Sequence, residues 1–413
     1  MLLSNHYGPD PRVAAEIDTL RAAGYSMRLI CWDRDFDRPI REEHEHLSIR
    51  RVRIRSTHRR GLSQGIFLAR YWLAAIRRAW DESIDLVHAH DFDTWPAAGP
   101  LASMFRVPLV LDVHDSFSDM MAGYLPAAAC RAIVHAENRF LRRADAVVTV
   151  GGRLGDALRQ RGAQRVTILP NAKRPREYRV DAAERRAWRA RLGIRPDQWC
   201  LGFISHLGHE RPVPAMIEAV ASDPRVVWVV GGAGYFEKTV ADAARRLSNV
   251  RFLGHVPPAD VPQLTAKFDA VFCGYDPDNP NARYSAPNKL FDALAAGRPL
   301  LSGDYGEVGE IIARHRCGAT VHRFVPAELR AALDRLADPD FRKEAGDRAA
   351  ALGRGEYDWD RVRLRLPALY ASLGITGESD RRGMDALGVD GIDSGGAARY
   401  RRRMMLAGSL VGA

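Results

Sequence analysis

A lysine and an aspartate stand three residues apart in the stretch SAPNKLFDALAAGRPL, residues 285–300. Pro287 before them is a residue type that begins helices, and Gly297 after them is one that ends helices, so the sequence predicts a short helix over 289–296. Lys289 and Asp292 then share one face. A charged face at a helix entrance suits a phosphorylated or hydroxylated ligand. A capped amphipathic helix with a solvated lysine and aspartate explains the same pattern.

A histidine and an aspartate end the segment VPLVLDVHD, which reads as an apolar strand. His114 and Asp115 therefore lie at the carboxyl end of a strand, where doubly wound folds place their ligands. A neutral imidazole there could hydrogen-bond to a bound ligand. A capped histidine at the end of a strand would look the same in sequence.

A second acidic motif follows the apolar residues 86–89. Asp91 and Asp93 form a DxD, a pattern that can hold a divalent metal on a diphosphate. His88 and His90 precede it and alternate along a strand, so they share one face. Because a DxD alone is a weak signal, the sequence predicts that these histidines line a cleft or cap the sheet and that no metal is bound.

Glycines at 231, 232 and 234 follow another predicted strand. They suggest a dinucleotide loop, but the full GxGxxG is absent. A tight turn from strand to helix explains them better. The missing glycine fingerprint therefore counts against a nucleotide-dependent dehydrogenase.

Strands and helices alternate along the chain and would position these residues. Apolar runs separated by amphipathic helices indicate parallel strands covered on both faces. Predicted strands lie at 2–4, 26–32, 48–55, 85–90, 108–113, 146–150, 200–205, 226–230, 250–253, 270–273 and 300–302. Predicted helices lie at 11–23, 66–80, 95–105, 127–143, 213–221, 235–247, 261–268, 289–296 and 359–373. Two doubly wound units in succession predict a cleft between domains.

The length of 413 residues exceeds what one hydrophobic core usually serves, and a 46% hydrophobic fraction is enough for two. No run of eighteen apolar residues occurs, and the opening MLLSNHYGPD is too short in apolar residues for a signal peptide, so we expect a cytoplasmic protein. The five cysteines lie far apart without a CxxC spacing, which indicates ordinary buried thiols.

The net charge of +10 is unevenly distributed. Residues 49–60, IRRVRIRSTHRR, carry six arginines and precede the apolar helix predicted at 66–80, which ends in Arg77, Arg78 and Trp80. This basic segment beside aromatics suits anionic lipid headgroups, and it predicts peripheral contact with the inner face of a membrane. The alternative is a strand with Val52 and Ile54 inward and its arginines in solvent. No nucleic-acid-binding motif accompanies the charge, so nucleic acid is not an expected partner.

Several segments together resemble a known family. They are the opening SNHYGPDPRV, the strand ADAVVTV, VTILPNAKRP, FISHLGHERP, the turn GHVP and PNKLFDALAAGRP. In this order they resemble a retaining sugar-nucleotide glycosyltransferase of family 4, whose GT-B fold has two doubly wound Rossmann-like α/β domains facing a cleft. The resemblance runs from about Leu2 to Leu373.

This resemblance implies a division of the chain. Residues 1–170 would form an acceptor-side domain, 171–198 a connection, 199–355 the nucleotide-sugar-binding domain and 356–373 a C-terminal helix. Residues 374–413, rich in Gly, Ser, Asp and Arg with little periodicity, are expected to be a disordered tail.

The resemblance also implies roles in binding the donor. Asp292 corresponds to the family's ribose-binding carboxylate, and Arg211 to a phosphate-binding cation whose planar fork can hold two phosphate oxygens. Lys289 is a further cation for the diphosphate, and Asn288 lies at the helix entrance, where backbone amides can assist. Gly254 and Val256 would pass the base and contact it through backbone.

On the acceptor side, His114 matches a family histidine near the sugar and the reaction centre. Gly8, in the loop after the first strand, would let backbone approach the phosphates. Two departures from the family stand out. Tyr284 replaces the first of two family acids, and Ser205 and His206 replace a Gly-Arg pair, so that His206 supplies a phosphate-binding cation only when protonated.

The implied activity is transfer of a sugar from a nucleotide-diphosphate sugar to an acceptor hydroxyl with retained configuration, in glycan, glycolipid or glycoconjugate synthesis. The acceptor would be a sugar, lipid-linked or a small molecule. No metal or other cofactor is expected, because Arg211, Lys289 and helix-end amides would stabilise the departing diphosphate. Two alternatives stay open at this stage, a nucleotide-sugar epimerase of the same fold and a non-catalytic sugar-nucleotide-binding homologue.

Overall fold

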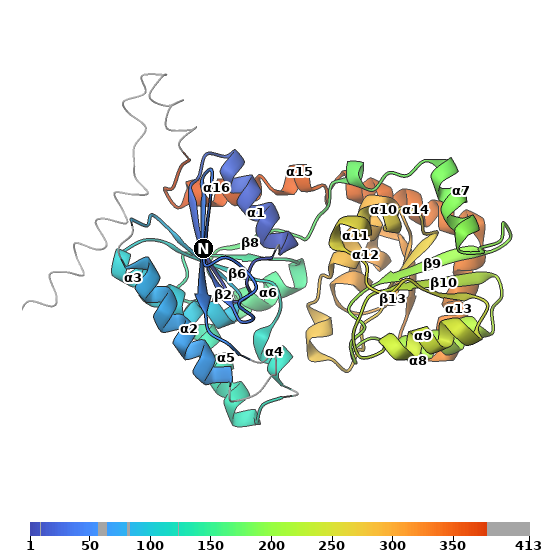
Figure 1. The fold of residues 1–413 in the computed structure, drawn as a ribbon, viewed down its shortest axis with the longest axis horizontal. Helices are drawn as coiled ribbons and strands as arrows, with labels where there is room; N and C mark the ends of the chain where they lie inside the picture. The colour runs from blue at the N-terminus through green and yellow to red at the C-terminus, as the bar shows by residue number, and fades with distance from the viewer. Residues whose placement is uncertain (9, 57–63, 81–82, 123, 378–413) are drawn as a thin grey trace, which may run out of the picture. The chain divides into compact units, whose positions relative to one another are not determined.

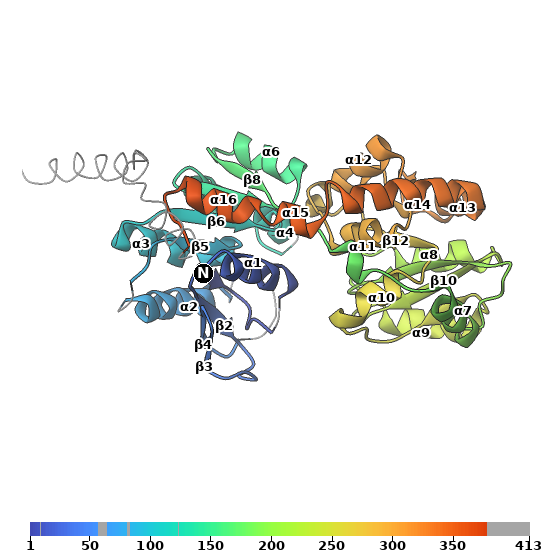
Figure 2. The ribbon, with the colours of Figure 1, turned by 90° about the horizontal axis from the view of Figure 1, so that it is seen from above.

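The computed structural model describes residues 1–377, apart from 9, 57–63, 81–82 and 123. The contacts divide the chain into two units. Among the described residues, the N-terminal unit contains 1–150, 154–169 and 363–377, and the C-terminal unit contains 151–153 and 170–362. Each unit is a largely parallel sheet with helices on both faces (Figure 1; Figure 2). The tail predicted to be disordered lies outside the described residues, except for its first four.

The N-terminal sheet has eight strands in the order β3-β4-β2-β1-β5-β6-β7-β8. All pair in parallel except β3, which runs antiparallel to β4. The strands are β1 (Leu2–Leu3), β2 (Met27–Asp33), β3 (Arg41–His44), β4 (Leu47–Arg53), β5 (Val87–His90), β6 (Leu109–Val113), β7 (Ala146–Thr149) and β8 (Val166–Ile168). Because β5 and β6 are neighbours in register, their carboxyl ends meet at one edge of the sheet.

Helices cover both faces of this sheet. Helices α2 and α3 pack together on one face, and α1 packs with α16 on the other (Figure 1). The helices are α1 (Pro11–Ala22), α2 (Gln64–Ala79), η1 (Phe92–Thr94), α3 (Trp95–Phe105), α4 (Phe117–Met121), α5 (Ala127–Leu141), α6 (Gly152–Gln160) and α16 (Arg365–Ser372).

The C-terminal sheet has six parallel strands in the order β11-β10-β9-β12-β13-β14. The strands are β9 (Trp199–Ile204), β10 (Val226–Gly231), β11 (Val250–Phe252), β12 (Ala270–Cys273), β13 (Leu300–Gly303) and β14 (Gly318–Val321). Strand order reverses between β9 and β12, since successive strands run outward from β9 on one side and from β12 on the other. In such sheets this reversal is where ligands bind.

The helices of the C-terminal unit again alternate with its strands. They are η2 (Pro175–Glu177), α7 (Ala182–Arg191), α8 (Val213–Ala221), α9 (Glu237–Arg246), η3 (Pro258–Asp260), α10 (Val261–Thr265), η4 (Pro280–Arg283), α11 (Asn288–Ala296), α12 (Gly306–His315), α13 (Pro326–Ala337), α14 (Pro339–Arg354) and α15 (Trp359–Val362). Apolar side chains of β9, β10 and β12, among them Phe203, Trp228 and Phe272, form the core with α8 and α13.

The helix predicted at 289–296 is confirmed as α11, which begins one residue earlier and ends where Gly297 takes a left-handed conformation with φ 63°. The single helix predicted at 359–373 is wrong. It is divided into α15 and α16, because Pro367 has no N–H to donate and its ring would clash with the carbonyl of Arg363.

The expectation that the arginines of residues 50–55 point into solvent is wrong for Arg51, which is 2% exposed. Its guanidinium donates to the carbonyl oxygens of His6 at 2.9 Å and Pro39 at 2.7 Å, and it pairs with Glu42. Arg51 therefore fixes the loop after β1. Strand β3, which carries Glu42, was not predicted.

None of the described helices is both long and apolar enough to cross a bilayer.

Candidate active site

His114 follows β6 and lies between two carboxylates. Its Nδ1 is 3.2 Å from Oδ2 of Asp91, which follows the neighbouring strand β5, and its Nε2 is 2.9 Å from Oδ2 of Asp112. Its backbone N–H also donates to Oδ1 of Asp91 at 3.1 Å. The side chain of His114 keeps 19% of its surface exposed. The ends of two adjacent strands thus hold this ring in one orientation.

The charge of His114 follows from these contacts. An ionised carboxylate only accepts hydrogen bonds, so a ring with a carboxylate at each nitrogen must carry a proton on both. Burial would lower the pKa of His114, but Asp91 and Asp112 together raise it well above the usual range. The neutral imidazole considered from the sequence is therefore replaced by an imidazolium whose N–H groups are both already paired.

The backbone of Asp91 is strained. Its φ of 57° and ψ of 158° lie in a region that is essentially reserved for glycine. Hydrogen bonds hold this conformation on both sides of the residue. The N–H of Asp91 donates to the carbonyl of Asp112 at 2.8 Å, and the carbonyl of Asp91 accepts from the N–H of Thr94 at 3.1 Å. A strained residue whose carboxylate points at one histidine indicates selection for that contact.

The carboxylate of Asp112 lies at the centre of this cluster and accepts hydrogen bonds from several of its members. It accepts from Nη2 of Arg12 at 2.9 Å and from Nδ1 of His90 at 3.2 Å, in addition to His114. Burial would raise the pKa of Asp112, but Arg12 and His114 hold it well below the usual range. Burial and then Asp112 raise the pKa of the nearby Glu16 well above its usual range, which favours its protonated form.

Four buried residues of the described chain come close enough to share a metal ion. Their ligand atoms lie within 4.8 Å of one another, and the four are Glu16, His88, His90 and Asp112. Nδ1 of His88 is 2.7 Å from the hydroxyl of Tyr370. The donor set suits a transition metal, but Arg12 already supplies a cation to both carboxylates. A divalent ion would add to the charges of Arg12 and His114, whereas one proton on Glu16 balances the cluster.

The predicted pair Asp91 and Asp93 does not act as a unit. Asp91 faces His114, whereas burial and then Asp91 raise the pKa of Asp93 to about 6. Neither belongs to the four-residue group above. The geometry instead makes Asp91 a partner of His114.

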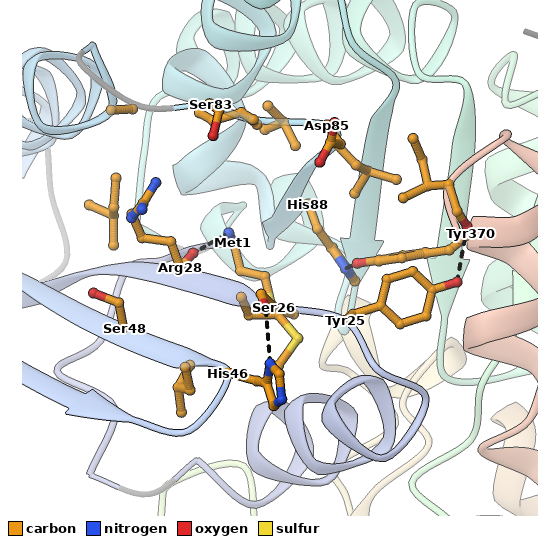
Figure 3. A pocket seen from close by; sticks show the side chains of 18 of the residues that line it. Met1, Tyr25, Ser26, Arg28, His46, Ser48, Ser83, Asp85, His88 and Tyr370 are labelled. Atoms are coloured by element: carbon orange, nitrogen blue, oxygen red, sulfur yellow. Dashed lines mark hydrogen bonds between the residues drawn. The ribbon is translucent and has the colours of Figure 1, made fainter. Parts of the chain in front are cut away.

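A cavity of about 510 Å³ lies at the amino ends of the strands of the N-terminal sheet (Figure 3). It is lined by the starts of β2 and β5, including Arg28 and His88, and by Tyr25 and Tyr370. Gly8 lies instead in the loop after β1, where an added Cβ would meet the ring of His6 at 2.6 Å. The predicted site residues of this unit, Gly8 and His114, therefore lie at the opposite ends of the strands from the cavity.

In the C-terminal unit, two cations flank the reversal of strand order. Arg211 follows β9 and is 8% exposed, and its guanidinium carbon lies 3.5 Å from the ring centre of Tyr275, which follows β12. Lys289, in the first turn of α11, donates from Nζ to Oγ of Ser205 at 2.9 Å. Its Nζ lies 5.7 Å from the same tyrosine ring. The predicted cations Arg211 and Lys289 are thus brought together around Tyr275.

The two cations are weakly neutralised. Nε of Arg211 lies 3.3 Å from Glu210, and no ion pair of Lys289 with an acid occurs among the described residues. Burial and then Arg211 lower the pKa of Lys289 to about 8. Two partly desolvated cations at the carboxyl edge of a parallel sheet can bind an anion such as a diphosphate.

Asp292 is buried one turn further along α11. Its Oδ1 accepts from the hydroxyl of Tyr178 at 2.6 Å and lies 3.8 Å from Nζ of Lys173, which also donates to Oδ1 of Asn288 at 2.8 Å. Asp292 and Lys289 thus have different partners although they share a helix face. A ribose hydroxyl bound here would share a carboxylate that the connecting segment already holds.

The remaining predicted donor contacts, His206, Gly254 and Val256, lie in the loops after β9 and β11, beside the glycines that follow β10. Gly254 has φ 68° and no heavy atom within 4 Å of an added Cβ, and its carbonyl accepts from the N–H of Gly232 at 2.7 Å. Val256 packs beside Gly231, and His206 is exposed beside Gly234. The glycines therefore let three loops approach one another, as a tight turn requires.

Sequence reasoning missed several residues of these clusters. They include Arg12, Glu16, Asp112, Lys173, Tyr178, Ser205 as a partner of Lys289, and Tyr275. Only Asp112 had a usable signal, because it lies two residues before His114 on the same strand and so shares its face. Tyr178 and Tyr275 contact their partners across the fold, which no local pattern reveals.

Two family models match most of the chain. Residues 8–172 match a glycosyl transferase 4-like domain, and residues 200–338 match the glycosyl transferases group 1. The first covers most of the N-terminal unit, including Asp91 and His114. The second covers the sheet that carries Arg211 and Lys289.

A curated relative is glycogen synthase of Mycobacterium tuberculosis, which is 26% identical over 308 residues, or 71% of this chain and 69% of the relative. Two solved structures share the fold. Sucrose-phosphate synthase from Thermosynechococcus elongatus has a TM-score of 0.74 at 16% identity, covering 90% of this chain and 98% of that one. Anabaena HepE in complex with UDP has a TM-score of 0.68 at 19% identity, covering 90% and 99%. This chain is a glycosyltransferase of the family 4 type with the GT-B fold.

Proposed function

We propose that this enzyme transfers a sugar from a nucleoside-diphosphate sugar to an acceptor hydroxyl with retention of configuration at the anomeric carbon. The observation that carries the proposal is the pair of cations, Arg211 and Lys289, at the reversal of strand order in the C-terminal sheet. Anabaena HepE has been solved with UDP and with UDP-glucose, which supports a nucleotide sugar as the donor class.

In this proposal the C-terminal unit binds the donor. Arg211 and Lys289 contact the diphosphate, the amides at the start of α11 beside Asn288 add further donors, and Asp292 accepts from the ribose. Gly254 and Val256 lie along the base and contact it through backbone, and His206 contributes to the phosphate end. Backbone contacts read a base weakly, so these residues leave its identity open.

The chemical step forms one bond and breaks another. The acceptor oxygen bonds to the anomeric carbon on the face from which the diphosphate leaves, and the bond from that carbon to the diphosphate oxygen breaks. The acceptor proton passes to the departing diphosphate. Arg211 and Lys289 stabilise the developing negative charge, and no side chain forms a covalent bond to the sugar.

His114 contributes as a fixed cation. Because Asp91 and Asp112 occupy both ring nitrogens, His114 is poorly placed as a general base. Its side chain is 19% exposed, and its positive charge can instead stabilise negative charge that develops nearby. We propose that transfer needs no added metal ion, and that the acceptor is a sugar, free or lipid-linked, in glycan or glycoconjugate synthesis.

The test is a transfer assay with purified protein. A thermal-shift screen over nucleotide sugars selects the donor, since a bound ligand raises the melting temperature. The donor is then incubated with sugar acceptors in chelator-treated buffer, and the anomeric configuration of the product is read by NMR. The proposal expects an acceptor-dependent product with the configuration of the donor. Inverted configuration, or conversion of the donor without acceptor, contradicts it.

A further inference from the structure

Helix α2 presents large apolar side chains to solvent. Ile66 and Leu73 are 68% and 59% exposed, and Trp80, immediately after the helix, is 63% exposed. Arg70 and Arg77 are exposed between them. Figure 1 shows α2, in blue, at the outside of the N-terminal unit beside α3.

These five residues form one stripe, which we call the α2 stripe. At about 100° per residue, the positions 66, 70, 73, 77 and 80 fall within an arc of about 80°, and they extend over about 21 Å of helix. The opposite face holds the buried residues Tyr71, Ala75 and Ala79. The helix is thus anchored to the sheet by one face and carries a separate apolar face outward.

The charge around the α2 stripe is positive. No acidic residue occurs between Gln64 and Trp80, and from residue 55 to residue 82 the sequence holds six arginines against two acids. A mixed stripe of aliphatic, tryptophan and arginine side chains matches the boundary of an anionic bilayer. There, acyl chains accept the apolar groups, the interface accepts tryptophan and phosphates accept arginine.

We propose that the α2 stripe binds the surface of a membrane that contains anionic lipids, with the helix lying in the plane of the interface. Leu73 and Trp80 insert between headgroups, and Arg70 and Arg77 pair with lipid phosphates. This inference goes beyond the proposed function, since it concerns where the enzyme acts and uses no residue of the transfer site.

The proposed lipid-binding residues therefore lie on α2 and not among the arginines of β4, which the sequence had suggested. Arg51 is buried and holds the loop after β1. Arg53 is tied to the protein by Asp33 at 3.4 Å and by the carbonyl of Arg38. These arginines are less available to lipid than the two on the α2 stripe.

The experiment is vesicle sedimentation with the full chain. Vesicles of phosphatidylcholine with phosphatidylglycerol are compared with vesicles of phosphatidylcholine alone. We expect binding to the first and little to the second. The variant Leu73→Gln/Trp80→Gln should lose about tenfold in vesicle affinity through its apolar contacts. The variant Arg70→Gln/Arg77→Gln should lose about fivefold for each arginine at low salt and less at high salt.

Matched controls separate position from composition. Arg245→Gln/Arg246→Gln removes the same charge from α9 in the C-terminal unit, and Leu364→Gln removes an apolar side chain that is 60% exposed. Neither should change vesicle binding. Circular dichroism and nucleotide-sugar binding should be unchanged in every variant, which excludes misfolding and keeps this test separate from that of the donor site.

Three outcomes would overturn the inference. The first is absence of binding of the unmodified protein to anionic vesicles. The second is an equal loss in the control variants. The third is a dimer, measured by light scattering, that the Leu73→Gln/Trp80→Gln variant converts to monomer, because the α2 stripe would then be an interface between copies of this chain.

Discussion

The two units treat charge in opposite ways. In the N-terminal unit, each charged group of the site is paired, with His114 between Asp91 and Asp112, and Arg12 between Asp112 and Glu16. In the C-terminal unit, Arg211 and Lys289 lie near each other, Arg211 pairs with Glu210, and Lys289 has no ion pair with an acid among the described residues. A neutralised cluster keeps its geometry without ligand, whereas an excess of positive charge becomes favourable only when an anion binds. We therefore expect the N-terminal unit to hold a preformed catalytic geometry around His114 and the C-terminal unit to bind the anionic donor.

The largest loss of transfer activity is expected for a change at Asp91. Changing Asp91→Asn removes one of the two carboxylates that hold His114 charged, so the pKa of His114 should fall. We expect transfer to drop about a hundredfold, since loss of one preorganised electrostatic contact costs of this order. The alkaline limb of the pH profile should move to lower pH, and the affinity for the donor should stay unchanged. Kinetics across pH and NMR titration of His114 measure these effects.

Asp93→Asn is the matched control for this change, because Asp93 lies two residues away and does not contact His114. Its profile should resemble that of the unmodified enzyme. Equal losses in the two variants would mean that the DxD acts as a unit, which contradicts the assignment of Asp91 to His114.

A smaller effect is expected at Lys289, where the pH dependence of diphosphate affinity tests the proposed donor site. Because its pKa is lowered to about 8, it is charged below that pH and loses its proton as pH rises through 8. Affinity for a nucleoside diphosphate should therefore fall several-fold between pH 7 and pH 9. In Lys289→Arg the guanidinium stays charged, so this decline should vanish. Calorimetry at several pH values measures it, and an identical decline in both proteins would assign the titration to another group.

The smallest effect is expected at Glu16. A neutral carboxyl resembles an amide in size and polarity, so Glu16→Gln should leave the melting temperature nearly unchanged near pH 4, where Glu16 is largely protonated in the unfolded chain as well, and should raise it at pH 7. The raised pKa means that Glu16 stabilises the fold most at low pH and loses this contribution as pH rises toward its folded pKa. Thermal melts from pH 4 to pH 9 should therefore show a flatter profile in the variant. A large loss at pH 7 would show that Glu16 is ionised.

The sequence predicted the parts of this picture that local patterns encode. Helix α11 was predicted to within one residue, because Pro287 and Gly297 mark its ends. Strand β3 was missed because REEH carries none of the apolar alternation of a strand, and the break before α16 was missed although Pro367 could have signalled it. β8, β14 and α12 were also not predicted.

The site was predictable as a set of residues but not as a set of contacts. Local patterns indicated Lys289 and His114, and the family resemblance added Arg211, whereas the two carboxylates around His114 depend on the pairing of β5 with β6. The burial of Arg51 was likewise hidden, because an arginine in an arginine-rich strand looks solvated until its partners across the fold are known.

The most direct test of the account is calorimetry with a nucleoside diphosphate and the matching nucleoside monophosphate. The unmodified enzyme should bind the diphosphate more tightly, because Arg211 and Lys289 pair with its added charge. In Arg211→Ala/Lys289→Ala, diphosphate affinity should fall about a hundredfold or more, since each of the two charge-assisted contacts is worth about 1.5–3 kcal/mol, and the preference over the monophosphate should disappear. A variant that kept both its affinity and its preference for the diphosphate would contradict the claim that these two cations capture the donor.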